Sequence, residues 1–288
     1  MSRDRYLVMG ATGNVGGALV RQLLAVGAEV RAAVRDPAAA SPPAGVEVVA
    51  GDFDQPGSLA AALAGVRAAF VLGGRREPRG LMSAIWTAGV EHVVLLTSRS
   101  VIGRVAGNAI SEMWSTSEDA LQAAEARGLS WTVLRPSGFQ SNALRWRAQL
   151  RAGDAVRLPF ADVAIAAIDA EDLAGVAAAA LTTRAYVGQH LELSGPEALL
   201  PATQLALLGA ALGRPLSVEP LVGEAVRTEL ARLFPPAFVD AQLRFFRDGE
   251  FDDARVVSTV ARVLGRPART FAQWVAAHAG DFVDIPGA

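Results

Sequence analysis

Short apolar runs alternate with segments of helical periodicity along the first two thirds of the chain. Continuous apolar runs are typical of strands whose two faces are both buried, as in a parallel sheet covered by helices. We predict strands at residues 6–9, 29–34, 46–49, 68–72, 90–96, 130–134, 163–168 and 190–193. The helical segments between them give a repeat of about 20–30 residues, which predicts a doubly wound parallel sheet, an α/β fold of the Rossmann type.

The pattern changes from Pro201 onward to short helical segments separated by glycine and proline. We predict helices there at residues 205–212, 224–234, 236–247, 252–264 and 271–282, which form a smaller, mostly helical C-terminal lobe. The expected division assigns residues 1–140 and about 161–195 to the Rossmann domain, and about 141–160 and 196–288 to the lobe.

Composition narrows the class of protein. The chain has 288 residues, of which 51% are hydrophobic, and this suffices for a large core. Its formal net charge of −2 gives no basic excess of the kind that binds nucleic acid. The apolar stretches are shorter than the roughly 18 residues of a membrane helix, and the N-terminal one is too short for a signal peptide. We therefore expect a cytoplasmic protein without membrane or nucleic-acid partners.

Two residue types are missing, and their absence limits the chemistry. The chain contains no cysteine, which excludes disulfides, thiol nucleophiles and thiolate metal sites. It also contains no lysine, so no Schiff base can form and no lysine can lower the pKa of a tyrosine. The three histidines lack metal-ligand spacing, and we predict no metal site.

A glycine-rich turn between the first predicted strand and helix is the strongest functional signal. It reads Gly-Ala-Thr-Gly-Asn-Val-Gly over residues 10–16. Such a turn brings bare backbone N–H groups and the positive end of a helix to one point, which suits a pyrophosphate. The sequence therefore predicts a dinucleotide site that involves Gly10, Thr12, Gly13, Asn14, Val15 and Gly16.

The end of the second predicted strand indicates which dinucleotide binds. NAD-binding sites usually have an acid there, about 20 residues after the glycine turn, that accepts from the ribose 2′-hydroxyl. This chain has Arg35, whose guanidinium can pair with a 2′-phosphate. We expect Asp36 to face away or to order the loop. The prediction is NADP(H), and the alternative is that Arg35 is a solvated surface residue.

Several motifs together resemble the NmrA-like branch of the atypical short-chain dehydrogenases. They are Gly10–Gly16, Val34–Pro37, Gly51–Asp54, Ala88–Val90, Leu134–Pro136 with Phe139 and Asn142, Ile168–Asp169, Glu171–Leu173, His190–Glu197 and Thr270–Trp274. The resemblance covers nearly the whole chain. It implies a two-lobed NADP(H)-binding protein in a family that includes quinone reductases, other small-molecule reductases and redox sensors. A homodimer is the oligomeric state we consider for it.

The resemblance also implies positions along the cofactor. Asp52 and Phe53 would flank the adenine, and Gly73 would lie near the adenosine ribose. Thr97, Pro136 and Phe139 would approach the nicotinamide side. Asp169, by contrast, reads as the N-cap of a helix rather than as a catalytic residue.

The chain departs from the family pattern at the catalytic residues. Short-chain dehydrogenases typically use Tyr-x-x-x-Lys, in which the lysine lowers the tyrosine pKa so that the tyrosine protonates the developing alkoxide. Here the only tyrosines are Tyr6, expected in the core, and Tyr186, in a late loop. Trp114 and Glu118 stand at the matching place, and neither can perform those roles. We therefore do not expect ordinary ketone reduction by that mechanism.

Hydride delivery to an already electrophilic acceptor remains possible. A quinone needs little acid assistance, because its own ring stabilises the product anion. Trp114, Phe139 and Trp146 could stack on a planar aromatic substrate, or they could pack in the core or between the lobes. Ser98, Glu118 and Asn142 are the polar candidates for catalysis, although for Glu118 the sequence favours a solvated helix face over a proton donor.

Three functions stay open from the sequence. The leading one is an NADPH-dependent oxidoreductase of a quinone or polycyclic aromatic molecule, for example in secondary metabolism. The second is a non-catalytic NADP(H) sensor that binds a regulatory partner, since the missing Tyr-x-x-x-Lys fits that function as well. The third is an enzyme that couples or isomerises aromatic compounds with help from the cofactor.

Overall fold

The larger part of the molecule is built on one parallel sheet. The structure is a computed structural model that describes residues 4–283. Seven strands lie in the order β3-β2-β1-β4-β5-β6-β8. They are β1 (Arg5–Met9), β2 (Glu29–Val34), β3 (Val46–Ala50), β4 (Ala68–Leu72), β5 (His92–Leu96), β6 (Ser130–Pro136) and β8 (Gln189–Leu193). The order reverses between β1 and β4, the point at which doubly wound sheets bind ligands.

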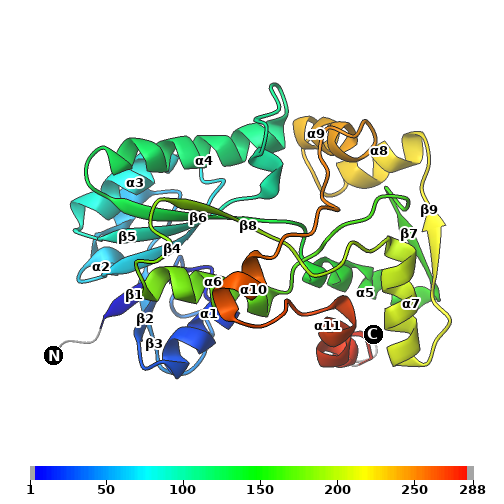
Figure 1. The fold of residues 1–288 in the computed structure, drawn as a ribbon, viewed down its shortest axis with the longest axis horizontal. Helices are drawn as coiled ribbons and strands as arrows, with labels where there is room; N and C mark the ends of the chain where they lie inside the picture. Colours follow the sequence, from blue (N-terminus) through cyan, green and yellow to red (C-terminus); the bar gives the residue numbers. More distant parts are fainter. Residues whose placement is uncertain (1–3, 284–288) are drawn as a thin grey trace.

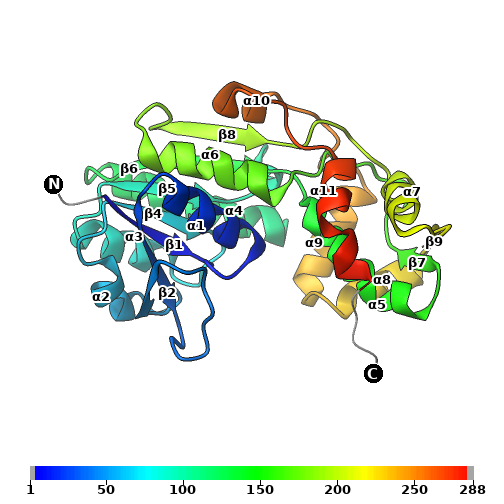
Figure 2. The same cartoon turned by 90° about the horizontal axis from the view of Figure 1, so that it is seen from below.

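Helices cover both faces of this sheet (Figures 1 and 2). Side chains alternate along β1: Tyr6 and Val8 belong to the apolar core under α1 and α6, and Leu7 and Met9 to the core on the opposite face. The helices are α1 (Asn14–Ala25), α6 (Ala170–Thr182) and α10 (Thr259–Leu264) on one face, and α2 (Ala60–Leu63), α3 (Pro78–Thr87) and α4 (Ala109–Glu125) on the other. The predicted Rossmann architecture is confirmed, and so is Tyr6 as a core residue.

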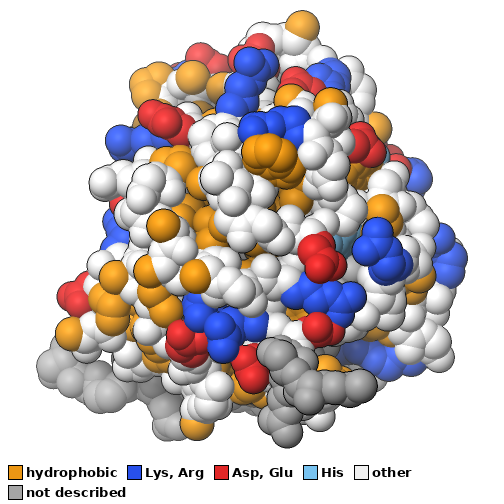
Figure 3. All heavy atoms as spheres, turned by 90° about the vertical axis from the view of Figure 1, so that its left-hand side faces the viewer, with side chains coloured by type: hydrophobic (Ala, Val, Ile, Leu, Met, Phe, Trp, Pro, Cys, Tyr) orange, Lys and Arg blue, Asp and Glu red, His pale blue; other side chains and the backbone are white. Residues whose placement is uncertain are grey.

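The smaller lobe lies at the carboxyl ends of the strands (Figure 1). Its helices are α5 (Arg147–Ala152), α7 (Pro201–Leu212), α8 (Glu224–Ala231), α9 (Pro236–Phe246) and α11 (Phe271–His278). Short 3₁₀ helices are η1 (Pro56–Leu59), η2 (Arg99–Val101), η3 (Gln140–Trp146) and η4 (Ala279–Phe282). The lobe has its own core around Trp146, Phe271 and Trp274. Figure 3 views the opposite end of the molecule, where acidic and basic side chains lie interspersed among apolar ones.

The lobe also contains a small sheet that the sequence did not predict. Strands β7 (Ala155–Leu158) and β9 (Ser217–Pro220) pair in parallel, separate from the main sheet. The division of the chain into two domains remains a prediction.

Two predicted elements are wrong at the junction of the lobe and the sheet. Residues 163–168 form no strand, because their backbone groups bond to three separate segments. The N–H groups of Ile165, Ala166 and Ile168 donate to the carbonyls of Leu199, Asp253 and Gly138, respectively. The helix predicted at 252–264 begins only at Thr259, because the preceding residues run extended across this junction. The predicted cap of α6 is confirmed, since Asp169 accepts from the N–H of Glu171.

Candidate functional site

The turn between β1 and α1 is tight enough to require glycine at two positions. Gly10 has a φ of +69°, a conformation that strains other residues. A Cβ at Gly16 would lie 2.0 Å from the carbonyl oxygen of Gly10. Gly13 is the N-cap of α1, has no side-chain cap, and is exposed together with Thr12 and Asn14. The first N–H groups of α1 are therefore available to an anionic ligand.

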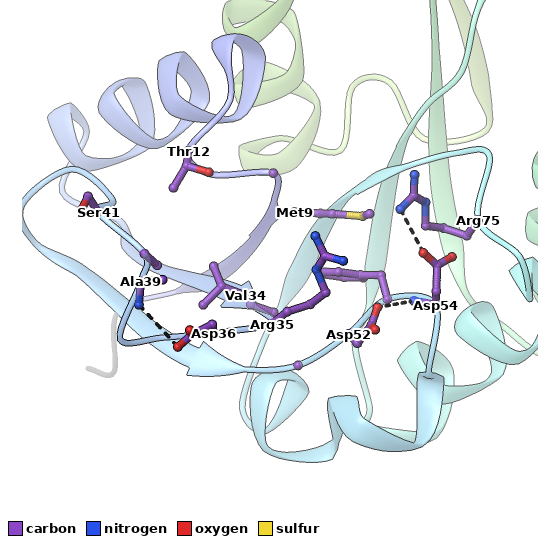
Figure 4. Close-up of a pocket in the computed structure, with 15 residues that line it drawn as sticks. Met9, Thr12, Val34, Arg35, Asp36, Ala39, Ser41, Asp52, Asp54 and Arg75 are labelled. Carbon is purple, nitrogen blue, oxygen red and sulfur yellow. Dashed lines mark hydrogen bonds and ion pairs between the residues drawn. The ribbon is translucent and has the colours of Figure 1, made fainter. Parts of the chain in front are cut away.

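A pocket of about 800 Å³ lies beside this turn, at the carboxyl ends of β1, β2 and β3 (Figure 4). Its lining includes five residues predicted to bind the cofactor: Gly10, Thr12, Arg35, Asp52 and Phe53. Phe53 is 6% exposed, so most of its ring packs in the core and only part of it faces the pocket. The five residues come from three different strand ends, and the fold alone brings them together.

Arg35 and Asp36 leave the end of β2 in different directions. The Arg35 side chain extends into the pocket, whereas Asp36 turns toward the loop that follows (Figure 4). Asp36 Oδ1 accepts from the N–H groups of Ala38 at 2.9 Å and Ala39 at 3.4 Å. This confirms that Asp36 orders the loop. Arg35 is exposed and makes no ion pair within residues 4–283, so its charge is available to a ligand.

Arg75 also lines this pocket, although the sequence did not suggest it. It follows the glycine pair at the end of β4, and its Nη1 lies 3.4 Å from Asp54 Oδ2 (Figure 4). Its Nε is buried and has no hydrogen-bond partner. A buried donor without a partner is costly, so an acceptor on a bound ligand would stabilise this arrangement. Its position three residues beyond the end of β4 was the signal that could have identified it.

Trp114 and Gly73 lie against each other at the end of β4. A Cβ on Gly73 would lie 3.2 Å from Trp114 Cε3 and 3.3 Å from Ser117 Oγ. Ser117 Oγ in turn accepts from the N–H of Gly74 at 2.9 Å. Trp114 is half-buried, and it lies beside the pair Gly73 and Gly74. Because the Trp114 ring packs this closely against residue 73, there is room at that position only for glycine.

Glu118 is held in a buried network. It is 1% exposed, so the solvated-face interpretation is wrong. Its Oε1 accepts from Thr97 Oγ1 at 2.8 Å and from Arg135 Nε at 2.9 Å, and its Oε2 accepts from Arg135 Nη2 at 2.5 Å. Both carboxylate oxygens are therefore engaged, which favours a structural role over proton donation. The Thr97 hydroxyl is buried and donates to Glu118 in the same network.

The other predicted residues separate into two groups. Ser98 caps the short helix η2, with its Oγ accepting from the N–H of Ser100 at 3.1 Å. Pro136 is buried at the last position of β6, paired with Leu193. Phe139 and Asn142 instead line a second pocket. The structure thus does not gather the four predicted catalytic residues at one point.

The second pocket, of about 720 Å³, lies between the end of β6 and the lobe. Gly138 and Phe139 contribute the sheet side, and η3 and α5 form a wall with Asn142 and Trp146. Trp146 is 8% exposed and belongs mainly to the lobe core. The apolar lining from the lobe includes Phe160, Leu230, Leu233, Phe234 and Phe246. This pocket can hold an apolar or aromatic ligand at the edge of the sheet.

Asp253 closes the inner wall of this second pocket. It is 5% exposed, and its Oδ2 accepts from the N–H of Gly138 at 2.9 Å. Its Oδ1 lies 3.7 Å from Arg99 Nη1 and has no hydrogen-bond partner. Burial raises the pKa of Asp253 to about 6, against the opposing effects of the Gly138 N–H and of Arg99. The carboxyl ties the extended segment before α10 to the end of β6.

Neither a metal-binding cluster nor a membrane-spanning helix is found in residues 4–283. Within that range no group of three or more histidine, aspartate or glutamate side chains could hold a metal ion. No helix that the structure describes is long and apolar enough to cross a membrane.

The family model and the similar proteins found by sequence comparison all point to NAD(P)H-binding reductases. A family model described as NAD(P)H-binding matches residues 10–184. The chain is 38% identical to the (4-alkanoyl-5-oxo-2,5-dihydrofuran-3-yl)methyl phosphate reductase of Streptomyces griseus, over 96% of this chain and 98% of that protein. It is 34% identical to the NAD(P)H azoreductase of Xenophilus azovorans, again over 96% and 98%.

Solved structures share the fold. The NADPH-dependent quinone oxidoreductase of Escherichia coli superposes with a TM-score of 0.77 at 22% identity, over 95% of this chain and 98% of that one. The triphenylmethane reductase of Citrobacter sp., solved with NADP(H), gives a TM-score of 0.78 at 20% identity, over 94% and 99%. At these identities the likeness establishes the fold.

Proposed function

We propose that this chain uses NADPH to reduce a conjugated small molecule. The premise is that it belongs to the NmrA-like, NAD(P)H-binding family and is an NAD(P)H-dependent oxidoreductase. The acceptor would be a quinone or an activated enone. One observation carries the proposal: two pockets lie at the same edge of the sheet, one beside the glycine turn with two arginines, the other largely apolar. Their arrangement suits a dinucleotide and a separate acceptor.

The residues present fit NADPH. The turn between β1 and α1 has no space for a side chain at Gly16. The uncapped N-terminus of α1 can bind a pyrophosphate. Arg35 supplies the positive charge that a 2′-phosphate needs, and Arg75 offers a buried donor nearby. When bound, NADPH supplies a hydride. Gly138 and Phe139, at the end of β6, would border the nicotinamide side of the site.

The missing proton donor restricts the acceptor. The chain has no lysine, and Glu118 is fully engaged with Thr97 and Arg135. An acceptor that stabilises its own negative charge after hydride addition does not need a strong acid. Quinones have this property, and so does a C=C bond conjugated to two carbonyl groups. The names of the two curated relatives describe such acceptors, an azo compound and an acyl dihydrofuranone, and this supports the proposal.

An acceptor panel tests the proposal. NADPH oxidation at 340 nm would be followed under anaerobic conditions with a naphthoquinone, an azo dye, a 2-acyl butenolide and an unactivated ketone. We expect saturable oxidation with at least one conjugated acceptor and none with the ketone. Comparable reduction of the ketone would contradict the proposal. The absence of any oxidation despite tight NADPH binding would instead favour a redox sensor.

A further inference from the structure

We infer that the second pocket selects an anionic amphiphile: an acceptor with an oxyanion group bound at Arg145 and Arg157 and an apolar part packed against the lobe. The inference rests on the proposed function and specifies the substrate class of the same site. Arg145, Arg157 and the apolar side chains of α8 and α9 all line this one pocket.

The short helix η3 places Arg145 on the same side of the pocket as Phe139, which lies next to the proposed nicotinamide position. Phe139, the N-cap of η3, and Asn142 and Arg145 within it are spaced three residues apart, and all three line the pocket. A 3₁₀ helix has three residues per turn, so these side chains lie on one face. Six residues at a rise of about 2 Å place Arg145 about 12 Å from Phe139 along the helix axis. A substrate could therefore span from the end of β6 to a charged group at Arg145.

Gln149 brings the second arginine to the same wall. It lies one helical turn beyond Arg145, on α5, and it binds both backbone groups of Arg157 on β7. Gln149 Oε1 accepts from the N–H of Arg157 at 2.8 Å, and its Nε2 donates to the Arg157 carbonyl at 3.3 Å. The side chain of Gln149 thereby fixes β7 beside α5, and both arginines line one pocket.

The acidic residues of the pocket do not neutralise this pair. Glu229 is engaged with Arg232 at 2.9 Å, and Asp253 is buried against the Gly138 N–H. The nearest acid to Arg157 is Glu219, at 3.9 Å on the exposed strand β9. The Arg145 side chain is exposed and makes no ion pair or hydrogen bond with any residue in the range 4–283. The pocket therefore offers a positive charge to its ligand.

The far wall of the pocket is apolar. Leu230 is buried in α8, whereas Leu233 is 57% exposed where it lines the pocket. The rings of Phe160 and Phe246 pack at 5.3 Å between centroids. Both phenylalanines also line a neighbouring pocket of about 800 Å³, so they form the partition between the two cavities. An apolar group of limited length fits against this partition.

Calorimetry with simple probes tests the ligand class without turnover. Octyl phosphate, octanoate, octanol and inorganic phosphate would be titrated into the full chain saturated with NADP⁺, so that the phosphate site of the cofactor is filled. We expect octyl phosphate and octanoate to bind at least about tenfold more tightly than octanol, and inorganic phosphate to bind weakly. Equal affinity for the octyl compounds, or inorganic phosphate binding as tightly as octyl phosphate, would overturn the inference.

Substitution identifies the residue responsible. Arg145→Gln should weaken octyl phosphate about tenfold and leave octanol unchanged. Arg151→Gln is the matched control, because Arg151 is exposed on α5 and does not line the pocket. An unchanged affinity for octyl phosphate in Arg145→Gln, or an equal loss in both variants, would refute the assignment.

A pair of acceptors separates this inference from the proposed function. One naphthoquinone would carry a six-carbon chain that ends in a phosphate, and the other the same chain ending in a hydroxyl. A preference of about tenfold in kcat/KM for the phosphate, abolished in Arg145→Gln, supports both. Equal turnover of the two acceptors overturns the inference and leaves the reductase function. Turnover of neither, with octyl phosphate still bound through Arg145, overturns the reductase function alone.

Discussion

Replacing Asp253 with asparagine should remove a pH-dependent cost of folding. Asp253 is 5% exposed, and Asp253→Asn keeps an acceptor for the Gly138 N–H while removing the ionisable group. Burial raises the pKa of the folded carboxyl from 3.8 to about 6. The folded chain therefore holds this proton more tightly than the unfolded chain does.

The sign and size of the effect follow from this difference in pKa. Because the folded state binds more protons than the unfolded state between pH 3.8 and about 6, the free energy of unfolding falls as the pH rises through that window. Above it, the ionised carboxylate costs about 3 kcal/mol relative to the protonated form. This cost already includes the attraction between Asp253 and Arg99, which lowers the pKa of the folded carboxyl.

Urea unfolding measures the prediction directly. Wild type and Asp253→Asn would be compared at pH 4 and pH 7.5 by circular dichroism. Relative to wild type, the variant should gain about 2.4 kcal/mol in free energy of unfolding between the two pH values, because the unfolded carboxyl is already partly ionised at pH 4. Asp162→Asn, at an exposed position, serves as the control and should show no such gain. If the difference between Asp253→Asn and wild type is the same at both pH values, the reasoning about the buried carboxyl is refuted.

Three further substitutions test the cofactor site and the buried network. Arg35→Ser should lower the affinity for NADPH about tenfold, measured by calorimetry, with little effect on NADH. Gly16→Ala should abolish binding of both cofactors, because the new Cβ would lie 2.0 Å from the Gly10 carbonyl oxygen. Glu118→Gln should lower the free energy of unfolding by about 3 kcal/mol in urea, because it leaves the charge of Arg135 without its partner.

The Arg35 and Glu118 substitutions each have a matched comparison. Arg79→Ser removes an arginine from the exposed face of α3, outside the pocket, and should leave the NADPH to NADH ratio unchanged. Glu125→Gln changes an exposed acid on the same helix as Glu118 and should leave stability within about 0.5 kcal/mol. An equal loss of NADPH and NADH affinity in Arg35→Ser would mean that this residue does not read the 2′-phosphate.

The main sheet could be predicted because its strands carry their own signal. Buried parallel strands appear as continuous apolar runs, as in Ala68–Leu72 and His92–Leu96. The small sheet of the lobe has no such signal. Ala155–Leu158 and Ser217–Pro220 are short and mixed in polarity, and each forms only because the other lies beside it. Pairing between segments this far apart leaves no local pattern.

The residues of the candidate site could likewise be predicted only where a local sequence pattern identifies them. Arg35 could be predicted because strand end and residue type together indicate a 2′-phosphate. The burial of Glu118 could not, because helical periodicity does not reveal that β6 supplies Arg135 opposite it. The two pocket residues Arg75 and Asp253 were missed for a related reason. Both lie in irregular segments; Arg75 follows the end of β4 directly, whereas only the folded chain brings Asp253 to the strand ends.

The central claim is that the chain transfers a hydride to a conjugated acceptor, and label transfer tests it most directly. NADPH deuterated at C4 would be incubated anaerobically with an excess of chain and the best acceptor of the panel. Both products would then be analysed by mass spectrometry and NMR. We predict that NADP⁺ forms stoichiometrically with the reduced product, and that for an enone acceptor the deuterium is found on carbon. A converted acceptor with unchanged cofactor, or a reduced enone without deuterium, would contradict the claim.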